Sequence, residues 1–418
     1  MTATASPFRL THVLPDSEIE IDNVGLKERL ERGEVIVIRG GMEIGGALDR
    51  TRTVIFEAIE EVLGAEIAAR VRAEGLEQIH TIVQVPDINR VHTLVTQRLK
   101  REFLPITERI VRETFGRENF WINYNAVMRF YVPNEVMAKG FDTLKAKQGK
   151  LVQHGPHHDI WQNVALNALN IWMAVDRVTV ENGMVIYAEH FPKIFPRGGD
   201  HVRIDQHLGK PVRTVCEPGD IVLFHSQHLH AGILNRSDKT RVVVTTRFSL
   251  DAPVQPRLGG AARYTSAAAI RSGKTWREDL STWLLGLKPD NILRRLENNR
   301  FTRAAIGRPG EENRRIKLFD PILRHNWYSE AIDRSDEAFA DPAIRVIDKA
   351  TIGVTVDGEE HVLSRFCPHQ GADLACGHVA AGLLHCPWHD QPFDPKTGEA
   401  VGPCSGLRSL KPRRARAA

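Results

Sequence analysis

The chain has 418 residues, of which 42% are hydrophobic and 26% are charged, a composition typical of globular proteins with two or three domains. No apolar run reaches the roughly 18 residues of a membrane-spanning helix, and the first residues lack a signal-peptide pattern, so we expect a cytoplasmic protein without a membrane partner. The net charge of +4 is spread along the chain, and the terminal block "KPRRARAA" has no interleaved aromatic residues, which argues against nucleic-acid binding.

Residues 16–120 combine helical periodicity with one short apolar strand. The segments "LKERLERG" and "LVTQRLKREFLPITERIVRETF" repeat apolar residues at helical spacing, whereas "EVIVIRG" has the pattern of a strand. The stretch "GGMEIGG" predicts a turn rather than a phosphate loop, because no lysine follows it in a strand-to-helix context. This part of the chain is expected to frame a sheet with helices.

Residues 121–250 change to short apolar or alternating runs that are separated by Asn, Gly, Pro and Asp turns. Such a pattern predicts a β-sandwich or a jelly roll. We place a first domain at residues 1–255 and a helical connector at 256–315, which contains "WREDLSTWLLGL" and "DNILRRLENN". A second, β-rich domain is expected at 316–418.

The second domain carries two pairs of metal-binding residue types. Cys367 and His369 form a Cys-x-His pair, and Cys386 and His389 form a Cys-x-x-His pair. Two thiolates on one iron and two imidazoles on the other give the Rieske type of two-iron cluster, and the same four residues also suit a structural zinc ion. The odd total of five cysteines argues against a secreted disulfide framework.

The surroundings of these pairs favour the cluster over zinc. The stretch from about Leu318 to Leu410 resembles the Rieske ferredoxin domain in "NWYSEAI", "CPHQGADL", "CPWHDQPFD" and "TGEAVGP". The resemblance implies an all-β domain with a [2Fe-2S] cluster on the two pairs. It is closer to the low-potential type, because Pro368, Pro387 and Trp388 fill the loop positions between the ligands.

A second candidate metal site lies in the first domain. The segment "QHGPHHDIWQ" supplies His157, His158 and Asp159, and two histidines with one carboxylate form the facial triad of mononuclear iron(II) oxygenases. Residues i and i+2 of an extended segment point the same way, so His157 and Asp159 can share one ion while His158 faces away. We choose His230 as the third ligand, because a polar turn after it would bring Arg241 back on a neighbouring strand, where a cation could hold a carboxylate.

Other histidines compete for the role of third ligand. His225 and His228 lie in the same segment, and His225 with His230 reads as H-x-x-x-x-H, a spacing that Rieske oxygenases use on a helix. The segment "GDIVLFHSQHLH" instead follows a Gly-Asp turn and has the pattern of a strand. His190, His201 and His207 are expected at the surface.

Residues from about 20 to 250 look like the phytanoyl-CoA dioxygenase family, because these motifs follow one another in the same order. The resemblance implies a double-stranded β-helix (a jelly roll, cupin-like) that binds iron(II) and 2-oxoglutarate. It further implies that Trp172 and Met128 line the cosubstrate pocket and that Arg241 pairs with the far carboxylate of 2-oxoglutarate. One departure is Gly232, where the family often has a serine.

The combined resemblances predict an iron(II)- and 2-oxoglutarate-dependent dioxygenase that uses O2 to oxidise a small molecule of secondary metabolism. Hydroxylation is the default reaction, with desaturation or oxidative ring closure as variants. The fused Rieske cluster would pass electrons from a reductase or ferredoxin to the iron or restore its iron(II) state, and a purely structural role for the cluster is the alternative. The alternative is a Rieske-type oxygenase that takes reductase-derived electrons without 2-oxoglutarate. A third interpretation is a non-catalytic electron carrier or redox sensor, and a homo-oligomer is left open.

Overall fold

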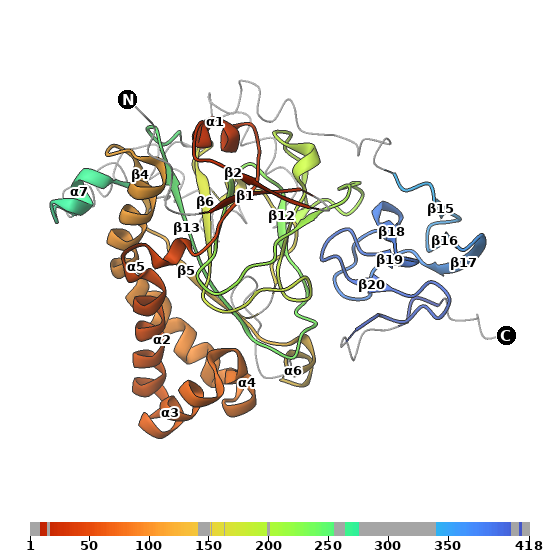
Figure 1. Cartoon of the computed structure of the whole chain (residues 1–418). Coiled ribbons are helices and arrows are strands. Elements are labelled where there is room, and N and C mark those ends of the chain that lie inside the picture. Colours follow the sequence, from red (N-terminus) through yellow and green to blue (C-terminus); the bar gives the residue numbers. More distant parts are fainter. Residues whose placement is uncertain are drawn as a thin grey trace, which may run out of the picture.

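The computed structural model of the chain describes residues 9–14, 17–140, 151, 153–162, 164–198, 201–254, 264–275, 340–402 and 409–411. These residues form two β-rich domains that lie against each other (Figure 1). Among the helices of these residues, none is both long and apolar enough to cross a bilayer. Of the helical connector expected at 256–315, only residues 264–275 are described, and both helices predicted in it lie outside the described residues.

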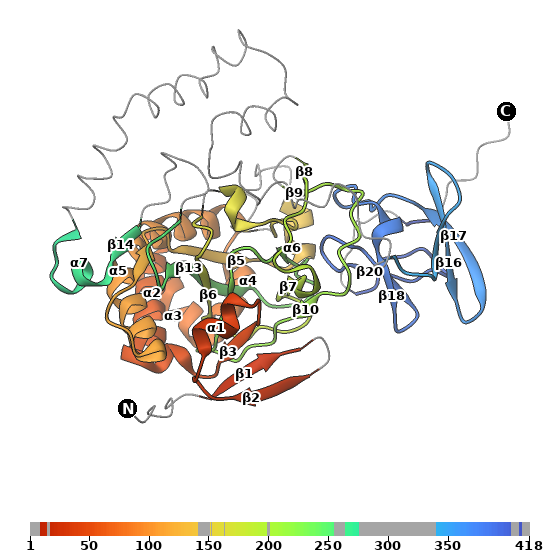
Figure 2. The ribbon, with the colours of Figure 1, turned by 90° about the horizontal axis from the view of Figure 1, so that it is seen from above.

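The helices of the first domain cover one face of its large sheet, as the helical periodicity predicts (Figures 1 and 2). The long helix α5 turns the buried side chains of Val91, Val95 and Leu99 toward the core, because residues four apart share one helix face. The helices are α1 (Leu26–Glu31), α2 (Ala47–Leu63), α3 (Ala65–Glu74), α4 (Ile79–Ile82), α5 (Val85–Phe115), α6 (Asn134–Gly140) and α7 (Ala267–Arg271).

Two facing sheets and a separate two-stranded sheet, β8-β9, build the first domain, which confirms the predicted jelly roll. The large sheet has the order β14-β4-β13-β6-β11-β3-β1-β2, with β5 also paired to β13, and the small sheet has the order β10-β7-β12. The strands are β1 (Leu10–Val13), β2 (Glu18–Ile21), β3 (Ile36–Ile38), β4 (Trp121–Asn123), β5 (Val127–Tyr131), β6 (Leu169–Ala174), β7 (Met184–Ile186), β8 (Arg197–Gly198), β9 (His201–Val202), β10 (Val212–Arg213), β11 (Ile221–His225), β12 (His230–Gly232), β13 (Arg241–Ser249) and β14 (Tyr264–Ser266). Because β14 pairs with β4, the first sheet continues past residue 255, where the sequence suggested a boundary.

Alternation along β13 defines the two faces of the large sheet. Val242 and Val244 pack into the apolar cluster beneath the helices, whereas Val243 packs into a second cluster that faces the small sheet. We call the face beneath the helices the outer face and the face toward the small sheet the inner face. Arg241, Thr245 and Arg247 share the inner face with Val243, because they lie two, two and four residues from it along the strand.

The second domain is all-β, as predicted. It consists of two three-stranded sheets, β15-β16-β17 and β18-β19-β20. The two Cys/His pairs lie in the loops between β17 and β18 and between β19 and β20. The strands are β15 (Ile344–Val346), β16 (Thr351–Val356), β17 (Glu359–Ser364), β18 (His378–Ala380), β19 (Leu383–His385) and β20 (Pro392–Phe393).

The two domains meet at the ligand loops of the second domain, drawn in blue beside β7, β8 and β10 in Figure 2. Arg213 of β10 donates from Nε to Asp390 Oδ2 over 2.6 Å, and the Arg236 guanidinium donates to the Asp390 carbonyl over 3.1 Å. Tyr187 donates its hydroxyl hydrogen to the carbonyl of Pro387. Trp388 belongs to an apolar cluster that spans both domains. The interface therefore holds the second Cys/His loop against the first domain.

Candidate metal centres

His157, Asp159 and His230 lie together inside the first domain, and all three are buried. An isolated antiparallel bridge joins His157 to His230 through two backbone hydrogen bonds of 3.0 and 3.2 Å. Asp159 then opens a short 3-10 helix (Asp159–Gln162), so the local backbone is extended only up to the residue before it. One ligand atom from each of the three residues lies within 4.8 Å of the others. The three side chains thus surround one point, where a single ion fits.

The hydrogen bonds of the two histidines leave one ring nitrogen of each free for a metal. The Nδ1 atoms of His157 and His230 lie 2.8 and 3.0 Å from the carbonyl oxygens of Gly155 and His228, so each Nδ1 carries the hydrogen and donates it. The lone pairs of Nε2 remain for the metal. Burial lowers the pKa of both imidazoles, so they are neutral at pH 7, as metal ligands must be.

Arg247 orients the carboxylate of Asp159 by a bidentate ion pair. Its Nε lies 3.1 Å from Oδ2 and its Nη2 lies 2.8 Å from Oδ1, and Nε also donates to Asn170 Oδ1 over 3.1 Å. Burial alone would raise the pKa of Asp159, but Arg247, together with His230 and Asn170, outweighs burial and lowers that pKa to about 2. Sequence reasoning missed Arg247. Its even spacing from Arg241 along one strand was the available signal.

Arg241 is a buried cation on the same inner face. Its Nη1 donates to the carbonyl of Asn182 over 2.7 Å and to that of Gly183, and its Cζ lies 3.9 Å from the ring centre of Tyr131. Its Nε has no hydrogen-bond partner, and no carboxylate of the described residues pairs with it. Burial lowers the pKa of this guanidinium to about 10. A buried cation without a counter-ion is costly, so the site favours an anionic ligand such as a carboxylate.

The two residues expected to line the cosubstrate pocket lie on different faces of the sheet. Trp172 packs on the inner face, 5.5 Å from Arg241 Cζ to its ring centre. Met128 pairs with Val244 and packs under the helices on the outer face, so it does not line this pocket. The sequence did not reveal the register of β5. In that register, the neighbouring residues Arg129 and Tyr131 take the inner face.

Gly232, the departure from the family pattern, makes room for Tyr131. A Cβ atom added at Gly232 would lie 2.8 Å from Cε2 and 3.1 Å from the hydroxyl oxygen of Tyr131. The aromatic ring that contacts Arg241 therefore occupies the space of a side chain at position 232. A tyrosine hydroxyl thus lies where the family often places a serine.

The competing histidines of the first domain have structural roles. His225 Nδ1 accepts a hydrogen bond from the backbone of Gln227 over 3.2 Å, and His228 Nε2 lies 3.0 Å from the carbonyl of Gly33. Neither belongs to the group of ligand atoms at the triad. Both β11 and β12 are strands, as predicted, so the H-x-x-x-x-H spacing does not lie on a helix.

His158 faces away from the triad, as predicted. Its Nδ1 donates to the carbonyl of Gln227 over 2.7 Å, and its Nε2 accepts from the backbone of Phe195 over 3.1 Å. His190 is buried against Phe195, at 4.7 Å between ring centres, so the expected surface position was wrong. His201 is partly buried at the domain interface, where its ring centre lies 5.5 Å from that of Trp388.

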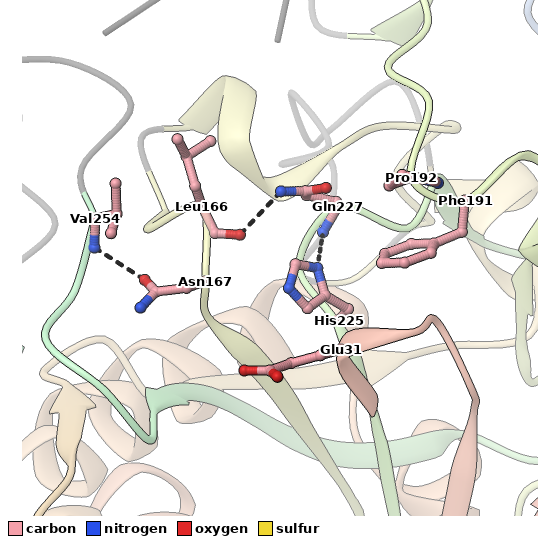
Figure 3. Close-up of a pocket in the computed structure, with 8 residues that line it drawn as sticks. All are labelled: Glu31, Leu166, Asn167, Phe191, Pro192, His225, Gln227 and Val254. Atoms are coloured by element: carbon pink, nitrogen blue, oxygen red, sulfur yellow. Dashed lines mark hydrogen bonds between the residues drawn. The ribbon is translucent and has the colours of Figure 1, made fainter. Parts of the chain in front are cut away.

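A pocket of about 380 Å³ opens on another part of the first domain (Figure 3). Its lining residues are Glu31, Leu166, Asn167, Phe191, Pro192, His225, Gln227 and Val254. None of them belongs to the triad. His225 alternates along β11 with Phe224, and Phe224 packs on the inner face. The pocket is therefore separate from the candidate iron centre.

The second candidate centre consists of Cys367, His369, Cys386 and His389, which the two loops bring together. The two imidazole rings lie 4.9 Å apart at an angle of 72°. The thiol of Cys386 hydrogen-bonds that of Cys367 and lowers the pKa of the latter. Nδ1 of His369 and both ring nitrogens of His389 are buried and have no hydrogen-bond partner in the part of the chain that the structure describes. Such atoms fit a cluster that would take two thiolates and two imidazole nitrogens.

Two other cysteines, Cys376 and Cys216, do not join this centre. Cys376 is buried beside β18, and the buried thiol of Cys216 lies in the first domain. Cys404 lies outside the described residues. Burial raises the pKa of Cys376 to about 12, which is typical of an unreactive thiol used as a small apolar side chain.

Both resemblances noted in the sequence are confirmed by family models. Residues 56–243 match the model of the phytanoyl-CoA dioxygenase (PhyH) family, and residues 331–410 match that of the Rieske [2Fe-2S] domain. The PhyH match identifies a domain of the kind that uses iron(II) and 2-oxoglutarate. The Rieske match confirms a [2Fe-2S] cluster.

Curated relatives share short segments with this chain. The 5,5'-dehydrodivanillate O-demethylase oxygenase subunit of Sphingobium sp. is 28% identical over 110 residues, which cover 26% of this chain and 23% of that protein. Apoptosis-inducing factor 3 of Mus musculus is 44% identical over 54 residues, which cover 13% of this chain and 9% of that protein. The chain thus spans less than a quarter of the length of these relatives.

Solved structures of similar proteins match about half of the chain weakly. The epimerase SnoN, solved with Fe3+, alpha ketoglutarate and nogalamycin RO, has a TM-score of 0.32 and 15% identity and covers 54% of this chain and 83% of its own. The alpha ketoglutarate dependent carbocyclase SnoK has a TM-score of 0.32 and 17% identity and covers 53% of this chain and 81% of its own.

Proposed function

Because this chain joins a phytanoyl-CoA dioxygenase domain to a C-terminal Rieske domain, we propose that it hydroxylates a small molecule with O2 and 2-oxoglutarate and that its cluster donates electrons to the iron site. Desaturation and oxidative ring closure are variants of the same reaction. The observation that carries the proposal is the combination of two features between the two sheets. A buried triad leaves two imidazole nitrogens free, and the buried Arg241 has no counter-ion among the described residues.

In this proposal, His157, Asp159 and His230 bind iron(II), and Arg247 keeps the carboxylate in its binding orientation. Arg241 binds the far carboxylate of 2-oxoglutarate through charge-assisted hydrogen bonds. Bound there, iron(II) and 2-oxoglutarate together activate O2 for the oxidation of a C–H bond. The buried walls of the inner face exclude water from the reacting groups.

Cys367, His369, Cys386 and His389 bind the [2Fe-2S] cluster in the same proposal. A coupled turnover takes two electrons from 2-oxoglutarate and two from the substrate, so its electron balance needs none from the cluster. Held by these four residues, a cluster would supply the single electron that returns iron(III) to iron(II) after a turnover without substrate. The contact between the ligand loops and the first domain within one chain supports this role.

Oxygen uptake tests the proposal. The protein that holds iron(II) and the [2Fe-2S] cluster is first supplied with 2-oxoglutarate alone. Candidate substrates are then added one at a time, and O2 loss and succinate formation are measured throughout. We expect slow succinate formation without substrate and a rise with the true substrate. The same interface between the domains also suits the alternative, a Rieske-type oxygenase. That alternative would consume O2 with a reduced electron-transfer protein and no 2-oxoglutarate, and such uptake would contradict our proposal.

A further inference from the structure

A polar contact joins the cluster site to the segment that carries the iron triad. Gln153 Nε2 lies 2.9 Å from His369 Nε2, across the domain interface. Gln153 is buried, and the next residue, His154, places its ring centre 4.0 Å from that of His157. One hydrogen bond and one covalently linked residue thus separate a cluster histidine from a ring that packs on a triad histidine.

A second set of contacts starts from the other cluster loop and reaches the same residue. Trp388 lies directly before His389, and its ring centre is 5.5 Å from that of His201. The ring centre of His201 is in turn 5.1 Å from that of His154. The two sets of contacts, one from each cluster loop, therefore converge on His154.

The backbone around His154 is held firmly beside the triad. Its carbonyl accepts a hydrogen bond of 3.2 Å from the backbone of Gly232, two residues after His230. A Cβ atom at Gly232 would lie only 3.3 Å from Cβ of Gln153, so glycine allows this close approach.

From these contacts we infer that His154 relays electrons from the cluster to the iron, with Gln153 and His201 as its two connections to the cluster loops. This inference rests on the proposed function. In the step, one electron leaves the reduced cluster, which becomes oxidised, and iron(III) at the triad becomes iron(II). No bond forms or breaks. An external one-electron donor, such as a reduced ferredoxin or dithionite, reduces the cluster beforehand.

The contact between Gln153 and His369 suits a ligated histidine. When Nδ1 of His369 binds the cluster, its Nε2 carries the hydrogen and becomes a donor. A half-turn of the Gln153 amide then exchanges nitrogen for oxygen at the same position and supplies the acceptor. A leucine at position 153 has a similar volume and removes this hydrogen bond.

Anaerobic mixing experiments on the protein that holds both the mononuclear iron and the [2Fe-2S] cluster test the relay. Iron(III) is generated by turnover without substrate, the remaining 2-oxoglutarate is removed, and one equivalent of dithionite-derived electrons is added. The cluster absorption bleaches and then recovers as its electron passes to iron(III). We expect recovery to slow by about tenfold or more in His154→Leu, and by less in Gln153→Leu and His201→Leu, because each keeps one connection. The reduction potential of the cluster is measured in each variant.

The control is Arg236→Gln, which removes a hydrogen bond to the Asp390 carbonyl across the same interface but lies off the route. Equal slowing in this control would show that docking sets the rate, and it would overturn the relay. Wild-type recovery in His154→Leu would overturn it as well. His154→Phe keeps an aromatic ring and should restore most of the rate. A phenylalanine variant as slow as the leucine variant, with loss of iron, would show a structural role instead.

These outcomes are distinct from a failure of the proposed function. If the chain does not use 2-oxoglutarate, no protein in the series forms succinate, even when ascorbate keeps the iron reduced. If only the relay is wrong, succinate forms with ascorbate in the wild type while the transfer rate is insensitive to position 154.

Discussion

Asp159 and Arg247 form a buried, bidentate ion pair at the bottom of the candidate iron site, with N–O distances of 2.8 and 3.1 Å. Asp159 is the first residue of a short 3-10 helix, whereas Arg247 lies near the end of β13. The strand therefore fixes the carboxylate that the 3-10 helix presents. Both partners are buried, so water could not solvate either charge if its partner were removed.

Replacement of Arg247 by methionine should weaken iron binding by about 10- to 100-fold, because the carboxylate loses its orienting partner. It should also lower the free energy of unfolding by about 3–5 kcal/mol, since a buried charge is left unpaired. Iron(II) titration and urea unfolding measure the two effects. Asn170→Leu is a milder matched change, because it removes one contact of Arg247 and leaves the ion pair. Unchanged iron affinity in Arg247→Met would show that Arg247 does not orient a ligand.

Arg241→Lys should raise the 2-oxoglutarate concentration needed for half-maximal succinate formation by about tenfold, because lysine keeps the charge and loses the fork of donors. Arg241→Met should raise it further, since no cation remains for the far carboxylate. The dependence of succinate formation on 2-oxoglutarate measures both. If the lysine and methionine variants match the wild type, Arg241 serves only the carbonyls of Asn182 and Gly183.

Variants at the two centres should act separately. Cys367→Ser or His389→Ala should abolish the cluster's visible spectrum, because each removes one of four ligands. His230→Ala should remove substrate-dependent succinate formation and keep that spectrum. Metal, sulfide and absorption measurements on the purified proteins check this. Stoichiometric zinc in the wild type, without sulfide, would contradict the cluster assignment.

Acid should destabilise the iron-free protein because two structural histidines stay neutral when folded. Burial lowers the pKa of His158 and of His228 to about 3, whereas each takes up a proton near pH 6.5 in the unfolded chain. Below about pH 6.5 the unfolded state binds more protons than the folded state. Each histidine therefore raises the equilibrium constant of unfolding about tenfold for each pH unit that the pH falls. The stabilisation is therefore complete at neutral pH and is lost as the pH falls.

Urea unfolding of the protein between about pH 7.5 and about pH 5 measures this slope. His158→Gln is the informative variant, since glutamine can donate to Gln227 and accept from Phe195 but does not titrate. It should reduce the slope by one proton. An equal slope in the variant would mean that His158 is protonated in the folded state.

The sequence predicted the parts of the sites that depend on short spacing. His157 and Asp159 lie two residues apart, and each Cys/His pair lies within one loop, so local geometry alone brings them together. His230 required a strand return, which the polar turn before Arg241 indicated. The strand patterns likewise predicted the jelly roll and the all-β second domain.

The missed features depend on register and on tertiary contacts. Met128 and Arg129 are neighbours, and only the pairing of β5 with β13 decides which one faces inward. Arg247 meets Asp159 across 88 residues of chain, and Gln153 meets His369 across 216. The even spacing of Arg247 from Arg241 indicates a shared face of β13, but no periodicity in a single sequence indicates which distant residue each side chain meets. The burial of His190 similarly follows from its packing on Phe195 rather than from its own segment.

The most direct test of the account is an anaerobic titration of the iron(II) protein with 2-oxoglutarate, followed as a difference spectrum in which the absorption of the oxidised cluster cancels. A chelate of iron by 2-oxoglutarate absorbs visible light, so we expect a new band that saturates at one equivalent per chain. Asp159→Ala should show no band, and Arg241→Lys should need more 2-oxoglutarate to reach the same amplitude. A wild-type protein without any band, which nevertheless consumes O2 with a reductant and no 2-oxoglutarate, would contradict the account.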